Sequence, residues 1–394
     1  MVADIDDWKG CKMKIVADSG IRFVEQCFSS IGQVKLVPGL QITPAVVADA
    51  DALIVRTATR VDANLLSGSS IRFAGTSTTG FDHIDLDFLR KNNIGFACGP
   101  GSNANSVAEY VVVAMLEVAE KTNCKLEDKS IGIIGVGNIG GNVAKKAASL
   151  GMKVFLNDPP LQRQTGDAKY LPLKELFDCD FITLHTPLTR TGPDKTFHLA
   201  DEEFFKSLKP GCIFVNTARG GVMDTTALKA AINSGTFKFV IIDVWENEPN
   251  IDTKLLEMVD IATPHIAGYS LDGKLTALIM VYKEACRYFG LDAKLDTESF
   301  LPAPEVPELK INPEGANQQQ LLLEVVRKIY DVKEDDSALR QILNKPVEQR
   351  ARYFETLRGG YHIRREFHTT RIILESACKP VADKLAGIGF IVEG

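Results

Sequence analysis

The sequence predicts an α/β protein with two series of βαβ units, the second on a doubly wound parallel sheet, followed by a small α+β domain. Short apolar runs alternate with helical stretches up to Gly290, which is typical of strands joined by crossover helices. A glycine-rich turn at residues 135–140 joins a buried run to a helix. Three prolines lie within residues 301–307, and the extended, stiff segment that they predict separates the last domain from the rest.

The first series of βαβ units lies before residue 103. Asn103–Thr122 is long and apolar on most faces, which predicts a buried helix that leads into the next domain. A shorter helix is expected at residues 21–31, and strands are expected at residues 14–17, 52–56, 71–75 and 94–98.

The second series begins at Ser130, and its spacing fits a doubly wound sheet with helices such as 224–234 between the strands. A helix at 272–290 then returns to the first domain. The predicted strands of this series cover residues 131–136, 153–157, 181–185, 212–217, 239–244 and 260–262. Beyond the prolines, the α+β domain is expected to contain helices at 318–330 and 347–357, a strand at 370–374 and a final helix–strand pair.

Composition excludes several classes of protein. The chain has 394 residues, enough for two or three domains, and its net charge of −6 without any long basic run argues against binding to nucleic acid. Eight cysteines without a C-x-x-C pair predict free thiols in a reducing compartment and no metal site. No apolar run is long enough to span a membrane, so we expect a cytoplasmic protein.

The glycine-rich turn matches the pattern G-x-G-x-x-G between a strand and a helix, where its backbone N–H groups bind the pyrophosphate of a dinucleotide. Asp158 ends the next strand, where an acidic side chain binds both ribose hydroxyls and repels a 2′-phosphate, so NAD is favoured over NADP. A glycine turn without any nucleotide is the alternative. The predicted phosphate-binding turn comprises Gly135, Gly137, Asn138, Ile139 and Gly140.

Three polar side chains follow successive predicted strands and form a candidate catalytic set. Arg219 offers a planar guanidinium that binds a carboxylate through two hydrogen bonds. A carboxylate such as Glu248 raises the pKa of a neighbouring His265 and orients its ring, so that the pair can act as general base in alcohol oxidation. Taken singly, each residue is better explained as a solvated or capping side chain, but three of them after three successive strands favour a catalytic set. His185 also ends a strand, and we interpret it as structural.

Together these motifs resemble the D-2-hydroxyacid dehydrogenase family. The resemblance rests on Gly135–Gly140, Asp158, His185–Leu188, Asn216–Gly221, Asp243–Trp245 and Pro264–His265. It implies an NAD-binding Rossmann domain (103–267) inserted in a flavodoxin-like substrate domain (1–102 and 268–299), with residues 300–394 as a dimerisation domain of a homodimer. It also implies cofactor contacts at Asp158, Thr186, Thr217, Ala218, Asp243 and Gly268, and substrate contacts at Thr57, Thr78 and Tyr269.

Further stretches, such as Gly75–His83 and Leu301–Glu305, resemble one branch of this family. Its substrate is a phosphorylated four-carbon 2-hydroxy acid on the route to pyridoxal phosphate. Arg56, beside Thr57, is the first candidate to bind the substrate phosphate, and the family commonly has Ser at the position of Thr57. Arg364 and Arg365 could instead reach a partner's active site, although a solvated basic pair is the simpler interpretation.

Two other functions stay open at this point. A D-3-phosphoglycerate dehydrogenase would share every catalytic residue, but its regulatory domain would have the order βαββαβ, whereas residues 309–394 open with a long helical half. An NAD-sensing co-repressor could also keep Arg219, Glu248 and His265, because a fold does not determine function. The sequence has no long basic or low-complexity tail that would recruit such partners.

Overall fold

The computed structural model describes residues 13–295 and 300–394, and it divides into two compact units. One unit combines Met1–Asn103 with Leu271–Pro302, and the other combines Ala104–Ser270 with Ala303–Gly394. The predicted three-domain division differs from these units in that residues 300–394 were expected to stand apart. We return to it below as a proposal.

The first unit contains a five-stranded parallel sheet of order β2-β1-β3-β4-β5. Alternate residues of each strand enter two cores: Ile15 packs with helix α11 on one face, whereas Val16 packs beneath α2, α3 and α4 on the other. The strands are β1 (Met13–Asp18), β2 (Gly32–Val37), β3 (Ala52–Val55), β4 (Phe73–Thr76) and β5 (Gly95–Ala97). The helices are α1 (Val24–Phe28), α2 (Pro44–Val47), α3 (Ala63–Leu66), α4 (Leu86–Lys91) and α11 (Leu271–Phe289).

The second unit contains a six-stranded parallel sheet of order β11-β10-β9-β8-β6-β7. The strand order reverses between β6 and β8, and in doubly wound sheets ligands bind outside the carboxyl ends of the strands at such a switch point. The predicted doubly wound parallel sheet is therefore confirmed. The strands are β6 (Ser130–Ile134), β7 (Lys153–Asn157), β8 (Phe181–Leu184), β9 (Cys212–Asn216), β10 (Phe237–Ile242) and β11 (Ile261–Ala262).

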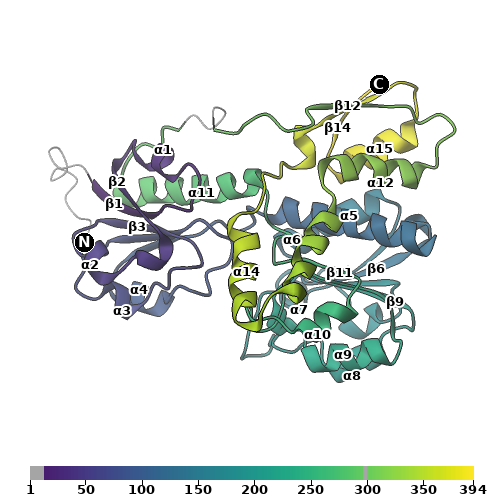
Figure 1. Cartoon of the computed structure of the whole chain (residues 1–394), viewed down its shortest axis with the longest axis horizontal. Helices are drawn as coiled ribbons and strands as arrows, with labels where there is room; N and C mark the ends of the chain where they lie inside the picture. The colour runs from purple at the N-terminus through teal and green to yellow at the C-terminus, as the bar shows by residue number, and fades with distance from the viewer. Residues whose placement is uncertain (1–12, 296–299) are drawn as a thin grey trace. The chain divides into compact units, whose positions relative to one another are not determined.

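Helices cover both faces of this sheet (Figure 1). The long α5 (Ala104–Thr122) and α6 (Asn138–Ser149) pack on one face, where Ile131 and Ile133 meet Val111 and Val143. The helices α8 (Glu202–Ser207), α9 (Thr225–Asn233) and α10 (Thr253–Met258) pack on the other face. The short α7 (Pro159–Thr165) follows β7. Because both faces are covered by helices, the strands are mostly apolar.

The C-terminal segment forms a three-stranded parallel sheet of order β12-β13-β14 and shares the core of α5 and α6. Leu322 and Val326 of α12 and Leu385 of α15 join the same apolar cluster as Val112 of α5. This shared core explains why the segment groups with the nucleotide-binding part. Its elements are β12 (Glu308–Ile311), α12 (Gln318–Ile329), α13 (Val332–Arg340), α14 (Val347–Gly359), β13 (Arg371–Leu374), α15 (Lys379–Ile388) and β14 (Ile391–Glu393).

The sequence-based elements differ from these at several places. The edge strand β2 and the strand β12 were not predicted, because both carry exposed polar residues in place of an apolar run. The helix that was expected to follow the glycine turn begins within it, at Asn138. Within the described ranges, the cysteines are free thiols, no three ligand side chains gather to hold a metal ion, and no helix is both long and apolar enough to cross a membrane. Cys11 lies outside those ranges.

Candidate active site

The glycine turn lies at the carboxyl end of β6, at the switch point, and leads into α6. Gly135 has a φ of 87° and a Cβ there would lie 2.8 Å from the carbonyl carbon of His185. A Cβ on Gly140 would lie 2.0 Å from the carbonyl oxygen of Gly135, so helix and turn can pack closely only with glycine. A Cβ on Gly137 would meet nothing within 4 Å. That open backbone at a helix N-terminus fits a pyrophosphate.

Asp158 follows β7 and carries two hydrogen bonds of its own. Its Oδ2 accepts from the Val136 N–H at 2.8 Å and its Oδ1 accepts from the Leu161 N–H at 3.0 Å. The carboxylate therefore ties the glycine turn to the start of α7, and the free lone pairs of its oxygens can still accept from ribose hydroxyls. Asp158 is also the N-cap of α7, whose first two residues are Pro159 and Pro160, so the same side chain has a structural role as well.

A third set of polar groups lies at the ends of β8 and β9. The His185 ring is held between Thr183 Oγ1 at 3.0 Å and Thr217 Oγ1 at 3.3 Å, and burial lowers its pKa to about 3. A neutral ring with a hydrogen bond at each nitrogen fits the structural role that we expected for His185. The neighbouring Thr186 Oγ1 is buried and has no hydrogen-bond partner among the described residues. An unpaired buried hydroxyl calls for a ligand group, which a bound dinucleotide would supply.

His265 and Glu248 form a short hydrogen-bonded pair in the second unit. His265 Nδ1 lies 2.7 Å from Glu248 Oε2, and their side chains are 29% and 18% exposed. Glu248 Oε1 accepts from the Trp245 N–H at 2.7 Å, which fixes the carboxylate. Burial acts to raise the pKa of Glu248, but the charge and hydrogen bond of His265 outweigh it, so the pKa lies below its usual value. The hydrogen bond to Glu248 uses Nδ1, so the other ring nitrogen, Nε2, takes no part in this pair.

Asp243 holds the loop that presents His265. Its carboxylate accepts from the Thr263 hydroxyl at 2.7 Å, the Ile266 N–H at 2.8 Å and the Ala267 N–H at 3.1 Å. Its carbonyl oxygen accepts from the His265 N–H at 2.7 Å. Asp243 is buried, and burial raises its pKa. The sequence indicated Asp243 as a cofactor contact, but its role in building this loop was not predicted.

Arg219 and Ala218 follow β9, at the same edge of the sheet. Arg219 Nη1 donates to the carbonyl oxygen of Ala218 at 2.8 Å, and the side chain is partly exposed. Gly220 is required next to it, because a Cβ there would lie 1.9 Å from the carbonyl oxygen of Trp245. This close approach joins the loop that carries Arg219 to the loop that carries Glu248.

The loop after His265 also contains Gly268 and Tyr269, both partly buried. The Tyr269 ring makes an edge-to-face contact with Tyr361 at 5.7 Å between centroids, and the guanidinium carbon of Arg358 lies 6.0 Å from the Tyr269 centroid. Both partners belong to the C-terminal segment. No local pattern predicts this contact, because it joins residues about 90 positions apart in the chain.

The other predicted substrate residues lie in the first unit, at the carboxyl ends of the paired strands β3 and β4. Thr57 is exposed. Thr78 Oγ1 donates to the Gly80 carbonyl oxygen at 2.7 Å. Arg56 Nε pairs with Asp18 Oδ2 at 2.9 Å, and Asp18 is buried. The charge of Arg56 is thus already balanced within its own unit.

Arg364 is not the solvated side chain that we had considered. It is buried, its Nη2 donates to the Ala267 carbonyl oxygen at 2.7 Å, and its guanidinium carbon lies 4.3 Å from the centroid of the Tyr330 ring. These contacts hold the C-terminal segment against the loop of Ala267. They leave Arg364 no access to the active site of a partner.

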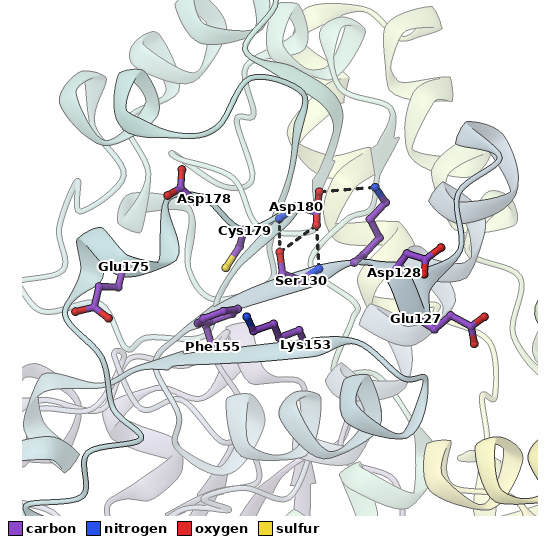
Figure 2. A pocket seen from close by; sticks show the side chains of 10 residues that line it. Glu127, Asp128, Ser130, Lys153, Phe155, Glu175, Asp178, Cys179 and Asp180 are labelled. Atoms are coloured by element: carbon purple, nitrogen blue, oxygen red, sulfur yellow. Dashed lines mark hydrogen bonds and ion pairs between the residues drawn. The ribbon is translucent and has the colours of Figure 1, made fainter.

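A pocket of about 480 Å³ opens at the opposite edge of the second sheet (Figure 2). It lies at the amino ends of β6 and β7, where Ser130 and Lys153 begin these strands. Asp180 in this pocket is already bound by Ser130 and by Lys209, at 2.8 Å for the lysine. The pocket is therefore distinct from the site at the carboxyl ends.

Comparison with known proteins identifies the chain's relatives. A family model described as "D-isomer specific 2-hydroxyacid dehydrogenase, NAD binding domain" matches residues 112–267, and a "Domain of unknown function" model matches residues 300–389. Erythronate-4-phosphate dehydrogenases of Escherichia fergusonii and Shigella boydii are each 41% identical over 379 residues, or 96% of this chain and 98% of theirs. The chain belongs to the erythronate-4-phosphate dehydrogenase branch of the D-isomer specific 2-hydroxyacid dehydrogenases.

Solved structures of this family agree with the fold. A D-lactate dehydrogenase from Aquifex aeolicus, solved with NAD and lactic acid, is 26% identical, with a TM-score of 0.55 over 70% of this chain and 94% of its own. An NAD⁺-bound 3-phosphoglycerate dehydrogenase from Entamoeba histolytica is 24% identical, with a TM-score of 0.61 over 74% of this chain, and supports the fold alone. The predictions of an oxidoreductase with an NAD-binding Rossmann domain are confirmed.

Proposed function

We propose that the protein oxidises 4-phospho-D-erythronate with NAD⁺ to (3R)-3-hydroxy-2-oxo-4-phosphooxybutanoate, a step in pyridoxal 5′-phosphate biosynthesis. The observation that carries the proposal is the His265–Glu248 pair, joined at 2.7 Å on the same sheet edge as the glycine turn. The near full-length similarity to erythronate-4-phosphate dehydrogenases supports the choice of substrate. A 2-hydroxy acid substrate also fits the description of the family model that the chain matches.

In the proposed mechanism His265 is the general base. Its Nδ1 is engaged by Glu248, so Nε2 receives the proton of the substrate hydroxyl. A bound NAD⁺ would supply the hydride acceptor for the oxidation. The ionised Glu248 stabilises the imidazolium that forms, and in reduction the pair returns the proton. Asp243 and Trp245 hold the two loops at fixed positions, which keeps the base ready for transfer.

Arg219 is proposed to bind the substrate carboxylate and to polarise the developing carbonyl, because a guanidinium matches a carboxylate through two parallel hydrogen bonds. The remaining proposed substrate contacts are Thr57, Thr78 and Tyr269, with Arg56 beside them. Asp158 is proposed to bind the adenosine ribose, with further NAD contacts at Gly135, Gly137, Asn138, Ile139, Gly140, Thr186, Thr217, Ala218, Asp243 and Gly268.

The C-terminal segment bears on the alternative substrate. A regulatory βαββαβ domain of a phosphoglycerate dehydrogenase was the expected alternative, whereas three helices here separate β12 from β13 and every strand pair in this sheet is parallel.

We propose that residues 300–394 form the dimerisation domain of a homodimer and that the chain works in the cytoplasm. The boundaries 1–102 with 268–299, and 103–267, remain our division of the other two domains.

One assay tests the proposal. The purified protein is mixed with NAD⁺ and 4-phospho-D-erythronate, with 3-phospho-D-glycerate in parallel, and NADH absorbance is followed. We expect faster turnover of the erythronate ester. Faster turnover of 3-phosphoglycerate would reject the substrate and retain the proposed catalytic residues. No turnover with either, even after a 2-oxo acid is added to discharge bound NADH, would favour an NAD-sensing role.

A further inference from the structure

Two arginines of the C-terminal segment, Arg327 and Arg340, use their donors in contacts with neighbouring elements. Arg327 donates to both oxygens of Glu117, at 2.6 and 2.7 Å. Arg340 pairs with Asp336 and donates to the carbonyl oxygens of Leu256 and Val259, both at 2.8 Å. These side chains hold the segment in place, and their donors are used.

Arg358, near the end of α14, is different. Its side chain is 16% exposed, and its buried Nε has no hydrogen-bond partner among the described residues. The one carboxylate within 4.0 Å of it in the described ranges is Glu355, which is 53% exposed and lies 3.2 Å from Nη1. A largely buried guanidinium with an unused donor is costly unless a further anion completes its hydrogen bonds.

The position of Arg358 identifies where that anion would bind. Its guanidinium carbon lies 6.0 Å from the Tyr269 ring, in the loop that carries His265. The charges of Glu248 and Asp243 are close enough to help raise the pKa of Arg358 against the opposing effect of burial. No hydrogen bond or ion pair joins Arg358 to Glu248 within the described ranges. Arg358 therefore lies beside the proposed reaction site, and its donors are not used by the carboxylate of the catalytic pair.

We propose that Arg358 binds the phosphate group of the substrate and so selects phosphorylated 2-hydroxy acids. This inference rests on the proposed function. A phosphate ester offers several acceptor oxygens to the planar fork of a guanidinium. The alternative cation Arg56 is balanced by buried Asp18. Arg364 Nη2 donates to the carbonyl oxygens of Ser106 and Ala267, and although its Nε and Nη1 have no partner among the described residues, the side chain is only 3% exposed, against 16% for Arg358. Arg219 is assigned to the carboxylate, so the two ends of the substrate would each have their own guanidinium.

The test compares Arg358→Met and Arg358→Lys with the wild-type protein. We measure kcat and KM for 4-phospho-D-erythronate. We also measure the inhibition constant of D-erythronate, which is the same four-carbon hydroxy acid without the phosphate group. The matched control is Arg352→Met, on the exposed face of the same helix. NAD⁺ affinity, measured by quenching of protein fluorescence, and thermal unfolding report whether each variant is folded.

We expect Arg358→Met to raise the KM for the phosphate ester roughly 10- to 100-fold, the usual loss for a charged hydrogen-bonded contact. Arg358→Lys should recover part of the loss, while the inhibition constant of D-erythronate, NAD⁺ affinity and the control stay unchanged. An unchanged KM, or equal weakening of ester and D-erythronate, would overturn the inference. A fall in kcat with a shifted pH profile would instead assign Arg358 to positioning of Glu248. Absence of wild-type turnover would overturn the proposed function itself, and this inference with it.

Discussion

At the scale of single residues, the site depends on backbone conformations that few side chains adopt. His265 has a φ of 57°, in the left-handed region, and Asn247, next to Glu248, has a φ of 61°. Such conformations cost free energy and persist only where surrounding contacts impose them. For His265, the carboxylate and carbonyl oxygens of Asp243 impose the conformation by accepting hydrogen bonds from the successive N–H groups of His265, Ile266 and Ala267.

Replacing His265 by Ala should reduce kcat/KM for the substrate roughly 10²- to 10⁴-fold, the usual contribution of a general base. NAD⁺ affinity should stay the same, because no contact of the glycine turn is lost. The matched control is His198→Ala, since His198 also pairs with a glutamate, Glu246, at 2.8 Å. Steady-state kinetics of both variants test this prediction, and an equal loss of kcat/KM in the two variants would reject His265 as the base.

Replacing Asp158 by Asn should have two separable effects. The ratio of kcat/KM for NAD⁺ to that for NADP⁺ should fall about tenfold, because the negative charge that repels a 2′-phosphate is gone. Stability should fall by about 1 kcal/mol, because the amide keeps one acceptor oxygen for the two N–H groups now bound. Kinetics with both cofactors and urea unfolding measure the two effects. An unchanged cofactor ratio would contradict the assignment of Asp158 to the ribose.

At the scale of elements, strong periodicity and turn signals predicted most of the chain. The strand at 153–157 and the helix at 103–122 agree with β7 and α5 to within one residue. The strands β2 and β12 were missed because both are edge strands whose residues are largely exposed. Residues that are not buried need not be apolar, so neither strand has the continuous apolar run that predicts a buried strand. The contacts of Arg358 and Tyr361 with Tyr269 were missed because packing between distant segments leaves no local signal.

The packing of α5 against the C-terminal segment places an ionisable group where pH should change stability. Glu109 is buried, accepts from the Phe367 N–H at 2.9 Å, and has a pKa raised to about 8 by burial and by Glu366. Between its usual value of 4.5 and about 8, the folded state therefore holds a proton that the unfolded state has lost. Stability should fall as pH rises through this window.

Replacing Glu109 by Gln should flatten this dependence, because the amide keeps an acceptor for Phe367 and cannot ionise. The free energy of unfolding, measured with urea from about pH 5 to about pH 8, should fall less steeply in the variant than in the wild type. The control is Glu324→Gln, an exposed glutamate on α12. Parallel slopes for wild type and Glu109→Gln would show that Glu109 is ionised throughout.

At the scale of the whole molecule, the proposed homodimer gives a direct expectation for mass. One chain weighs 43.1 kDa, so a dimer weighs twice that, 86.2 kDa. Sedimentation equilibrium at micromolar concentration should give the dimer mass. A mass of one chain, independent of concentration, would contradict the assignment of residues 300–394 to dimerisation.

The discontinuous first unit has a consequence for the order of events during synthesis. Helix α11 supplies Leu278, Val281 and Tyr282 to the same core as Ile15 and Phe73, yet the entire nucleotide-binding sheet lies between them in the chain. A ribosome delivers residues from the N-terminus onward, so one face of the sheet of β1 to β5 is covered only in part, by α1, until α11 has been translated. The part of the chain that is made first thus completes its own core only after β6 to β11 have been made.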